Sequence, residues 1–192
     1  MTENVWKDIV AVTNRRLTER PYVQQIERIC RKNPRAVLIR EKDMTEEEYA
    51  RLAGEAAEVC RKYHIPCVYH TYLEEALRAG IRNIHLPLHV LRKYAGNPVL
   101  SQFESVGASV HSAEEALEAA KLGASVLTAG HVYATDCKKG LPPRGLSFLR
   151  EVCRAVELPV YAIGGVHTDG QIREVMECGA AGACIMSEAM RI

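Results

Sequence analysis

The stretch VGASVHSAEEALEAAKLGASVLTAG, residues 106–130, decides the fold. It opens with a short apolar run at Val106–Val110 and closes with a second one at Ser125–Ala129. Between them, Ser112 followed by Glu114 is typical of a helix start, because a hydroxyl caps free N–H groups and an acid suits the positive end of the helix dipole. A strand, a helix and a second strand in this order predict two parallel strands joined by a right-handed crossover.

The same unit recurs along the whole chain. Eight apolar runs are interpreted as strands: Ile9–Thr13, Ala36–Arg40, Pro66–His70, Asn83–Leu86, Val106–Val110, Ser125–Ala129, Val160–Ile163 and Ala183–Met186. Helical patterns lie between them at Tyr22–Lys32, Thr45–Tyr63, Leu73–Ala79, Val90–Ala95, Ala113–Leu122, Leu146–Val156 and Asp169–Cys178. Eight such units favour a closed (β/α)8 TIM barrel, with an open doubly wound sheet as the alternative. Without a Gly/Ser-rich linker, we expect one domain over residues 1–192.

The end of the chain predicts a truncated or missing eighth helix. Only Glu188–Ile192 follow the eighth strand, far fewer residues than an average helix contains. A parallel barrel needs cover on the outer face of every strand, so a gap is expected beside strands eight and one. Either the N-terminal segment with Trp6 or a second copy of the chain can cover it, and we favour a homodimer.

Composition narrows the classes of partner and compartment. Lys and Arg (25) nearly balance Asp and Glu (24), so no overall field favours nucleic acid or an anionic membrane. Seven cysteines without a CxxC spacing argue against a disulfide framework and a zinc ribbon. The first residues, MTENVWKD, lack an apolar secretory core, and no apolar run approaches the ~20 residues of a membrane span. We therefore expect a cytoplasmic protein.

The segment GHVYATDCKKG, residues 130–140, follows the sixth strand and carries several reactive side chains. In a barrel, the loops after the strands are where chemistry is done. His131 can give or take a proton near neutral pH. Cys137 is interpreted as a loop residue, since no base is placed beside it by sequence. Lys138 and Lys139 either close over a substrate's negative charge or solvate a mobile loop.

Two later segments predict a phosphate site. AIGGVHTDGQI (162–172) places Gly164 and Gly165 after the seventh strand, and CIMSEA (184–189) places Met186 and Ser187 after the eighth. Loops seven and eight of a barrel often present backbone N–H groups to a phosphate. The alternative is that the glycines only make a tight turn.

These motifs together resemble a known family. The matching pieces are VTN (12–14), LIREK (38–42), GASVHSAEEA (107–116), GHVYATDCKKG (130–140), AIGGV (162–166) and CIMSEA (184–189). In order and spacing they resemble the thiamine phosphate synthase/TenI superfamily of (β/α)8 barrels, over nearly the whole chain. The resemblance implies a phosphorylated thiazole as ligand. It leaves two enzymes: a synthase that couples a pyrimidine diphosphate to a thiazole phosphate with magnesium, and a thiazole tautomerase.

Departures from the synthase pattern lead us to expect the tautomerase. Leu38 stands where synthases typically have glutamine, Thr71 stands in place of the aspartate of Asn-Asp-Arg, and HLPLHV (85–90) replaces HLGQxD. Magnesium usually takes one or two protein carboxylates, and both expected ones are absent. The segment 130–140 resembles the tautomerase version. We therefore expect an isomerase without metal or cofactor; the alternatives are the synthase and a catalytically silent barrel that binds a phosphorylated metabolite.

The resemblance assigns roles to the candidate residues. His131 would remove the ring proton and return it to the exocyclic carbon. Arg40 and Lys42 would face the substrate anion, with an ion pair between Arg40 and Glu41 as the alternative for Arg40. The substrate-binding candidates are Arg40, Lys42, His70, Ser109, Gly164, Gly165, Met186 and Ser187. For His70, packing of the loop is an equally good interpretation. His85, His111 and His167 lack metal-ligand spacing and are expected to be hydrogen-bonded near strand ends.

Overall fold

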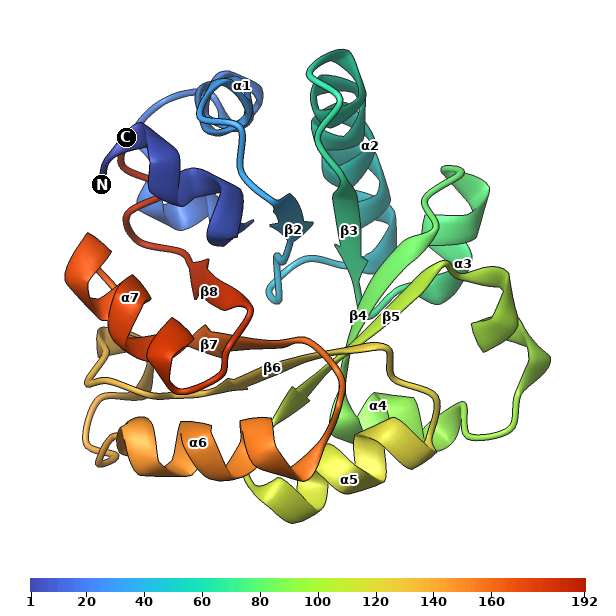
Figure 1. Cartoon of the computed structure of the whole chain (residues 1–192). Helices are drawn as coiled ribbons and strands as arrows, with labels where there is room; N and C mark the ends of the chain where they lie inside the picture. Colours follow the sequence, from blue (N-terminus) through green and yellow to red (C-terminus); the bar gives the residue numbers. More distant parts are fainter.

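A computed structural model describes the backbone of residues 1–192 and the side chains of residues 1–2 and 5–192. Eight parallel strands form a closed barrel, with the helices outside it (Figure 1). The strands are β1 (Ile9–Val12), β2 (Ala36–Ile39), β3 (Cys67–His70), β4 (Asn83–Pro87), β5 (Ser105–Val110), β6 (Val126–Gly130), β7 (Val160–Ile163) and β8 (Gly182–Ile185). Each pairs with the next, and β8 closes onto β1 with Ala183 opposite Ile9. The predicted TIM barrel is confirmed, and the open sheet is excluded.

Seven α-helices connect successive strands: α1 (Tyr22–Arg31), α2 (Glu46–Lys62), α3 (Leu73–Arg78), α4 (Leu88–Lys93), α5 (Ala113–Lys121), α6 (Gly145–Ala155) and α7 (Asp169–Glu177). Their starts follow local chemistry. Ser112 accepts a hydrogen bond from the N–H of Glu115, and Thr45 and Thr168 each form a capping box with the residue three places on. The helix α4 begins at Leu88, two residues before the predicted start, directly after Pro87.

The strands separate two packed regions. Their outward side chains pack beneath the helices in one large apolar cluster that includes Ile39, Leu86 and Leu127. A smaller cluster of Val12, Leu38, Tyr161 and Cys184 comes from β1, β2, β7 and β8. Because side chains alternate along a strand, this second cluster lies inside the barrel. It fills the interior on the β7–β2 side and leaves the β3–β6 side for polar groups.

The N-terminal segment fills much of the place of an eighth helix. After β8 the described chain forms turns and no further α-helix. The 3-10 helix η1 (Glu3–Asp8) leads into β1, and Trp6 is only 1% exposed. Thr2 donates its hydroxyl to Asp169 at the start of α7 (2.8 Å). The two chain ends lie next to one another beside α1 in Figure 1. The N-terminal cover, one of the two expected alternatives, is therefore observed.

The C-terminal turn is attached to α1. Gln25 is fully buried and donates its side-chain amide to the carbonyl of Ala189 (2.8 Å), and Arg20 donates to the carbonyl of Ile192 (2.7 Å). Within the described part of the chain, no helix is both long and apolar enough to cross a membrane.

Candidate active site

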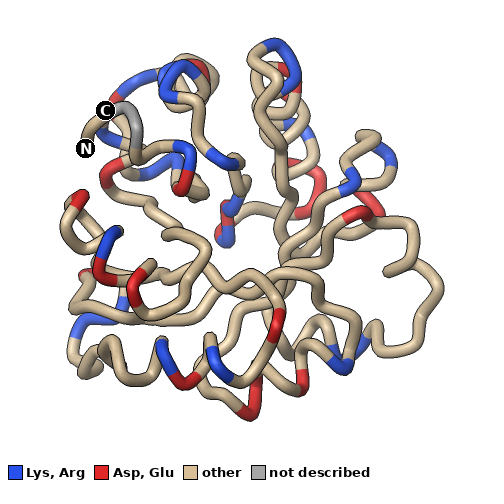
Figure 2. Tube along the Cα trace, in the orientation of Figure 1, with Lys and Arg blue, Asp and Glu red and all other residues tan. Residues whose placement is uncertain are grey.

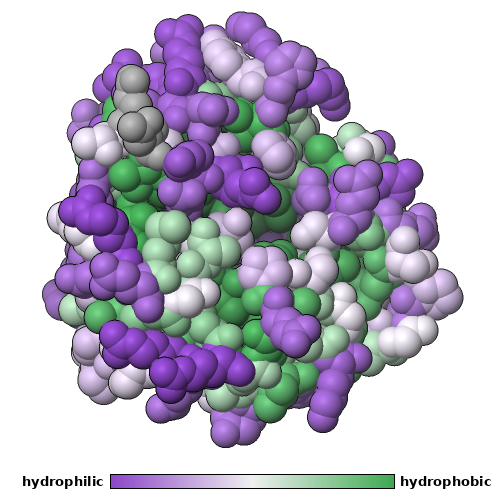
Figure 3. All heavy atoms as spheres, in the orientation of Figure 1, coloured by the Kyte–Doolittle hydropathy of each residue, from purple (hydrophilic) through white to green (hydrophobic). Residues whose placement is uncertain are grey.

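One cavity of about 480 Å³ opens at the carboxyl ends of the barrel strands. All nine residues predicted from the sequence line it: Arg40, Lys42, His70, Ser109, His131, Gly164, Gly165, Met186 and Ser187. Apolar residues gather toward the centre of the face seen in Figure 3, within a margin of hydrophilic ones. The roles of the nine residues stay predictions, but the fold brings them to one place.

Four Lys and Arg side chains line this cavity; Arg92 is paired with Glu118, and the other three have no such partner among the described side chains. Arg40 and Lys42 follow β2, and Lys138 ends the 3-10 turn η4 (Asp136–Lys138) after β6. Burial lowers the pKa of the Arg40 guanidinium, while partial desolvation, then the charges of Arg40 and Lys138, lowers the pKa of Lys42. Among the described side chains, no carboxylate lies within ion-pair distance of any of the three. Such a cluster favours a ligand with several negative charges.

The alternative for Arg40, an ion pair with Glu41, is not found. Glu41 is 3% exposed and accepts hydrogen bonds from the Thr13 hydroxyl (2.8 Å) and the backbone N–H of Arg15 (3.0 Å). The Arg15 guanidinium lies between Glu41 and Asp43 and lowers the pKa of Asp43 to about 2. Basic and acidic residues follow one another in this loop after β2 (Figure 2). The acids therefore face β1, and Arg40 is left to the cavity.

Gly164 and Gly165 follow β7 and form another part of the cavity wall. Both have left-handed backbones, with φ of 97° and 70°. A Cβ on Gly164 would lie 2.4 Å from the Cβ of His131, and one on Gly165 would lie 2.3 Å from the carbonyl oxygen of Ala134. Both glycines are thus required by backbone angle and by close approach. They let the β7 loop pack directly against the β6 loop in the wall of the cavity.

His131 stands next to these glycines. Its Nε2 atom is buried and has no hydrogen-bond partner in the described structure, although the residue lines the cavity. A buried polar atom without a partner costs free energy, so a bound ligand that supplies the partner would be favoured.

A polar network occupies the barrel interior below the cavity. The His85 Nε2 atom lies 2.8 Å from the Ser109 hydroxyl oxygen and 3.3 Å from that of Thr128. The His85 ring stacks on that of His70, with centroids 5.9 Å apart. Gly107 makes room for the ring, since a Cβ there would lie 2.4 Å from His85 Nδ1. Ser109 is thus held at the cavity floor from beneath.

Burial keeps both histidines of this network neutral. It lowers the pKa of His85 to about 4, with the positive charge of Arg40 adding to the effect. For His70, burial and then the neighbouring His85 hold the pKa well below its usual value. With the proton on Nδ1, neutral His85 accepts a hydrogen bond at Nε2 from the closer Ser109 hydroxyl, and the Thr128 hydroxyl lies 3.4 Å from Ser109 Oγ. The hydroxyl of Ser109 would then present its oxygen lone pairs to a ligand.

Sequence reasoning missed Thr128 and left Lys138 undecided. Thr128 lies in a run that was interpreted as a fully apolar strand. Because side chains alternate along a strand, Thr128 shares a face with Gly130, and this is the only signal that predicts its inward position. The other histidines behave as expected. His85 is hydrogen-bonded inside the barrel, and the Nδ1 atoms of His111 and His167 lie 3.1 and 3.2 Å from Glu115 and Glu188, respectively.

The side chains of this cavity do not fit a magnesium ion. Thr71, at the expected aspartate position, does not line the cavity, and its hydroxyl lies 2.6 Å from His70 Nδ1. Segment 85–90 contributes no acid. Glu115 is the one carboxylate among the described lining residues, and it already accepts a hydrogen bond from the backbone N–H of His111 (2.6 Å). Magnesium prefers oxygen ligands that include carboxylates, which the cation-rich wall does not offer.

Comparison with known proteins identifies the family of the chain. The family model described as thiamine monophosphate synthase matches residues 9–189. The chain belongs to this family. It is 31% identical to "Thiamine-phosphate synthase 2" of Streptococcus pneumoniae, over 88% of this chain and 80% of that one. It is 32% identical to "Thiamine-phosphate synthase" of Caldanaerobacter subterraneus, over 91% and 82%. A solved "Thiamine phosphate pyrophosphorylase" of Pyrococcus furiosus superposes with a TM-score of 0.78 at 26% identity, covering 98% of this chain and 96% of that one.

These relatives overturn the expected activity. The prediction of a thiazole tautomerase, an isomerase, is wrong, because the relatives that match over most of both chains are named as synthases, which are transferases. The prediction relied on the carboxylates that are missing at Thr71 and in segment 85–90 and on the histidine at position 131. Missing carboxylates change how the charge of the substrate is balanced, and one histidine in a loop does not by itself define the reaction.

Proposed function

We propose that the protein is a thiamine-phosphate synthase, a transferase that joins a pyrimidine carrying a methyl diphosphate to a thiazole phosphate. The observation that carries this proposal is that one cavity brings together two regions of different kinds, each of which we propose to bind a phosphate group. The first is the cation cluster of Arg40, Lys42 and Lys138; the second is the backbone at Gly164 and Gly165. A reaction between two phosphorylated molecules needs both. The names of the relatives support the same reaction class.

The coupling is a substitution at the methylene carbon of the pyrimidine. The bond from this carbon to the diphosphate oxygen breaks, and the oxygen leaves with the electron pair. A bond forms between the same carbon and the thiazole nitrogen, whose positive charge makes the thiazolium ion. No proton is transferred in this balance. A base is therefore not required, and His131 acts in the proposal as a hydrogen-bonding group for a substrate.

The chain's own residues supply binding, charge and position. Arg40, Lys42 and Lys138 stabilise the negative charge that grows on the departing diphosphate. The glycine backbone holds the thiazole phosphate so that the ring nitrogen faces the methylene carbon, which replaces an encounter of two free molecules by a bound pair. Val12 and Ile163 line the same cavity and exclude water from the electron-poor carbon.

The test is product formation by the purified protein from both substrates, followed by chromatography of thiamine phosphate and by release of pyrophosphate. We expect equal amounts of the two products. We expect His131→Asn to lower kcat/KM about tenfold, the order of one lost hydrogen bond to a substrate. Absence of both products with either substrate in excess would contradict the proposal.

A second function is favoured by one observation, the lack of acids at Thr71 and in segment 85–90. In this alternative the barrel binds a phosphorylated metabolite and catalyses nothing. The same assay separates the two functions. Binding of thiazole phosphate without any product after prolonged incubation would support the silent barrel over the synthase.

We also propose a homodimer and a cytoplasmic location, as predicted from the sequence. Val23 on α1 and Met176 on α7 are exposed, and both helices border the gap beside β8. The support for a dimer is that closed two-fold pairs are the commonest oligomers, and these two side chains offer a place to test it. Light scattering should give twice the chain mass, and Val23→Glu with Met176→Glu should give the monomer. Leu117→Glu on α5 is the control, because Leu117 is equally exposed away from the gap. A monomeric parent protein at high micromolar concentration would refute the dimer.

A further inference from the structure

The cation cluster is distinguished by its place, because its three unpaired side chains converge on one cavity. Arg15, Arg78 and Arg92 each lie within ion-pair distance of a carboxylate. Arg40, Lys42 and Lys138 have no such partner among the described side chains. They line the same cavity and come from two loops that are far apart in sequence. The fold therefore brings like charges together at the cavity and directs Glu41 and Asp43, the acids of the β2 loop, toward β1.

The surroundings of the cluster are unsuited to a divalent cation. Glu41, the acid closest in sequence to Arg40, is buried on the β1 side with its oxygens hydrogen-bonded to Thr13 and Arg15. Glu115 is held by the backbone of His111. A magnesium ion bound here would meet three positive charges and, among the described side chains that line this cavity, only the carboxylate of Glu115, so Coulomb repulsion opposes it. A diphosphate alone, with several negative charges, would meet only attraction.

We propose that this site holds a diphosphate through Arg40, Lys42 and Lys138 without a divalent metal. The inference rests on the proposed function, because it assigns the diphosphate of that reaction to these three side chains. Arg40 is half-buried and reaches the ligand from the floor, while Lys42 and Lys138 are exposed at the mouth and close on it from two sides. Guanidinium and ammonium groups both bind phosphate oxygens with charge-assisted hydrogen bonds.

The sign of the magnesium effect is the decisive measurement. Inorganic pyrophosphate is titrated into the full chain by calorimetry, once with EDTA and once with magnesium chloride. Magnesium binds pyrophosphate in solution and competes with the protein for it. We therefore expect binding in EDTA that becomes several-fold weaker with magnesium. Binding that appears only with magnesium, or that tightens tenfold with it, would overturn the proposal.

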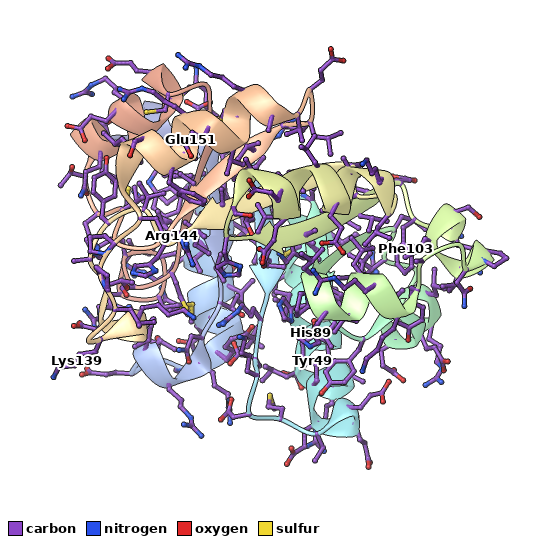
Figure 4. The ribbon with its side chains drawn as sticks, turned by 90° about the horizontal axis from the view of Figure 1, so that it is seen from below. Tyr49, His89, Phe103, Lys139, Arg144 and Glu151 are labelled. Atoms are coloured by element: carbon purple, nitrogen blue, oxygen red, sulfur yellow. The ribbon has the colours of Figure 1, made fainter. Side chains whose placement is uncertain are left out.

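Variants then assign the binding to the cluster. Lys42→Met and Lys138→Met should each weaken pyrophosphate binding in EDTA about tenfold, and Arg40→Met should weaken it further because Arg40 is the least hydrated of the three. Lys139→Met is the matched control. Lys139 is the next residue in the loop, is exposed, lies at the edge of the molecule in Figure 4 and does not line the cavity. Equal losses in Lys138→Met and Lys139→Met would refute the assignment.

The proposed function and this inference can fail separately. Pyrophosphate that binds in EDTA while no thiamine phosphate forms would sustain the metal-free site and reject the synthase. Thiamine phosphate that forms only when magnesium is added, with no binding in EDTA, would sustain the synthase and reject the metal-free site.

Discussion

Four consecutive residues, Arg40–Asp43, serve two different environments. Glu41 and Asp43 face Arg15, which donates to Asp43 through both terminal nitrogens at 2.6 and 2.9 Å. Arg40 and Lys42 face the cavity and have no carboxylate partner among the described residues. The two cations and the two acids alternate along the same short loop. What separates them is whether the structure itself satisfies the charge.

The difference shows how a site is distinguished from a structural ion pair. A paired group contributes to folding and has little left to offer a ligand. An unpaired charged group costs folding free energy unless water or a ligand satisfies it. Unpaired cations that converge on one cavity, as Arg40, Lys42 and Lys138 do, therefore point to a ligand there. On this criterion the acids of the segment fix the β1 and β2 loops to each other, and the cations belong to function.

The largest expected effect tests this division through stability. Arg15→Met should lower the free energy of unfolding by about 3 kcal/mol, because it leaves the buried carboxylate of Glu41 without its cation. Arg40→Met should change it by less than about 1 kcal/mol, since no partner is lost. Urea denaturation of the two variants and the parent measures the difference.

Arg92→Met is the control for an exposed pair. Arg92 binds Glu118 with two contacts of 2.7 Å, but both side chains are largely exposed, so the expected loss is below about 1 kcal/mol. If Arg40→Met destabilises the fold as much as Arg15→Met, Arg40 has a structural partner and the comparison breaks down.

The second prediction uses pH to sharpen the same contrast. The folded protein holds the pKa of His85 at about 4, below the ordinary value near 6.5. Between these values the unfolded chain binds more protons than the folded one, so stability is present above about pH 6.5 and is lost as the pH falls toward 4. The expected loss between pH 7 and pH 4.5 is about 2 kcal/mol.

Urea denaturation at several pH values measures this slope. His85→Gln removes the titrating group and should flatten it, although His70, which is also held neutral, leaves part of the slope in place. Acids with a lowered pKa, such as Asp43, contribute mainly below about pH 4.5 and do so equally in parent and variant, so the difference between the two isolates His85. A parent protein whose stability is unchanged from pH 7 to pH 4.5 would mean that His85 is not desolvated.

Much of the fold could be predicted from the sequence because its signals are local. Alternating apolar runs and capped helices fixed all eight strands to within about one residue at each end. The site residues could be placed together for the same reason, since every strand of a barrel ends at one rim. Thr128 escaped because its neighbours are apolar, and a single polar residue in such a run does not show which way it faces.

The reaction could not be predicted in this way. The absence of acids at Thr71 and in segment 85–90 was interpreted as evidence for another enzyme, but a missing group does not indicate what replaces it. The cation cluster that we propose to act without magnesium is visible only in three dimensions, where Lys138 from the β6 loop lies near Arg40 and Lys42 from the β2 loop. No spacing in the sequence relates loops so far apart. For the cover over β8 the sequence offered two alternatives, and the burial of Trp6, which depends on contacts between the chain ends, identifies the N-terminal segment as a cover.

The smallest expected effect concerns the uncharged side of the cavity. Ser109 lies between His85 and the open cavity, so its orientation depends on neutral His85 beneath it. His85→Gln should raise KM for the pyrimidine diphosphate about tenfold, equivalent to about 1.4 kcal/mol, with kcat changed less. Ser109→Ala should have a similar effect, and the double variant should be no worse than either one, because both changes remove the same oriented hydroxyl. Thr128→Val is the milder control, since its hydroxyl lies 3.3 Å from His85 Nε2 instead of 2.8 Å. Strictly additive losses would show that His85 acts on the substrate by a route other than Ser109, and a fall in kcat alone would show that the pair serves the reaction step and not recognition.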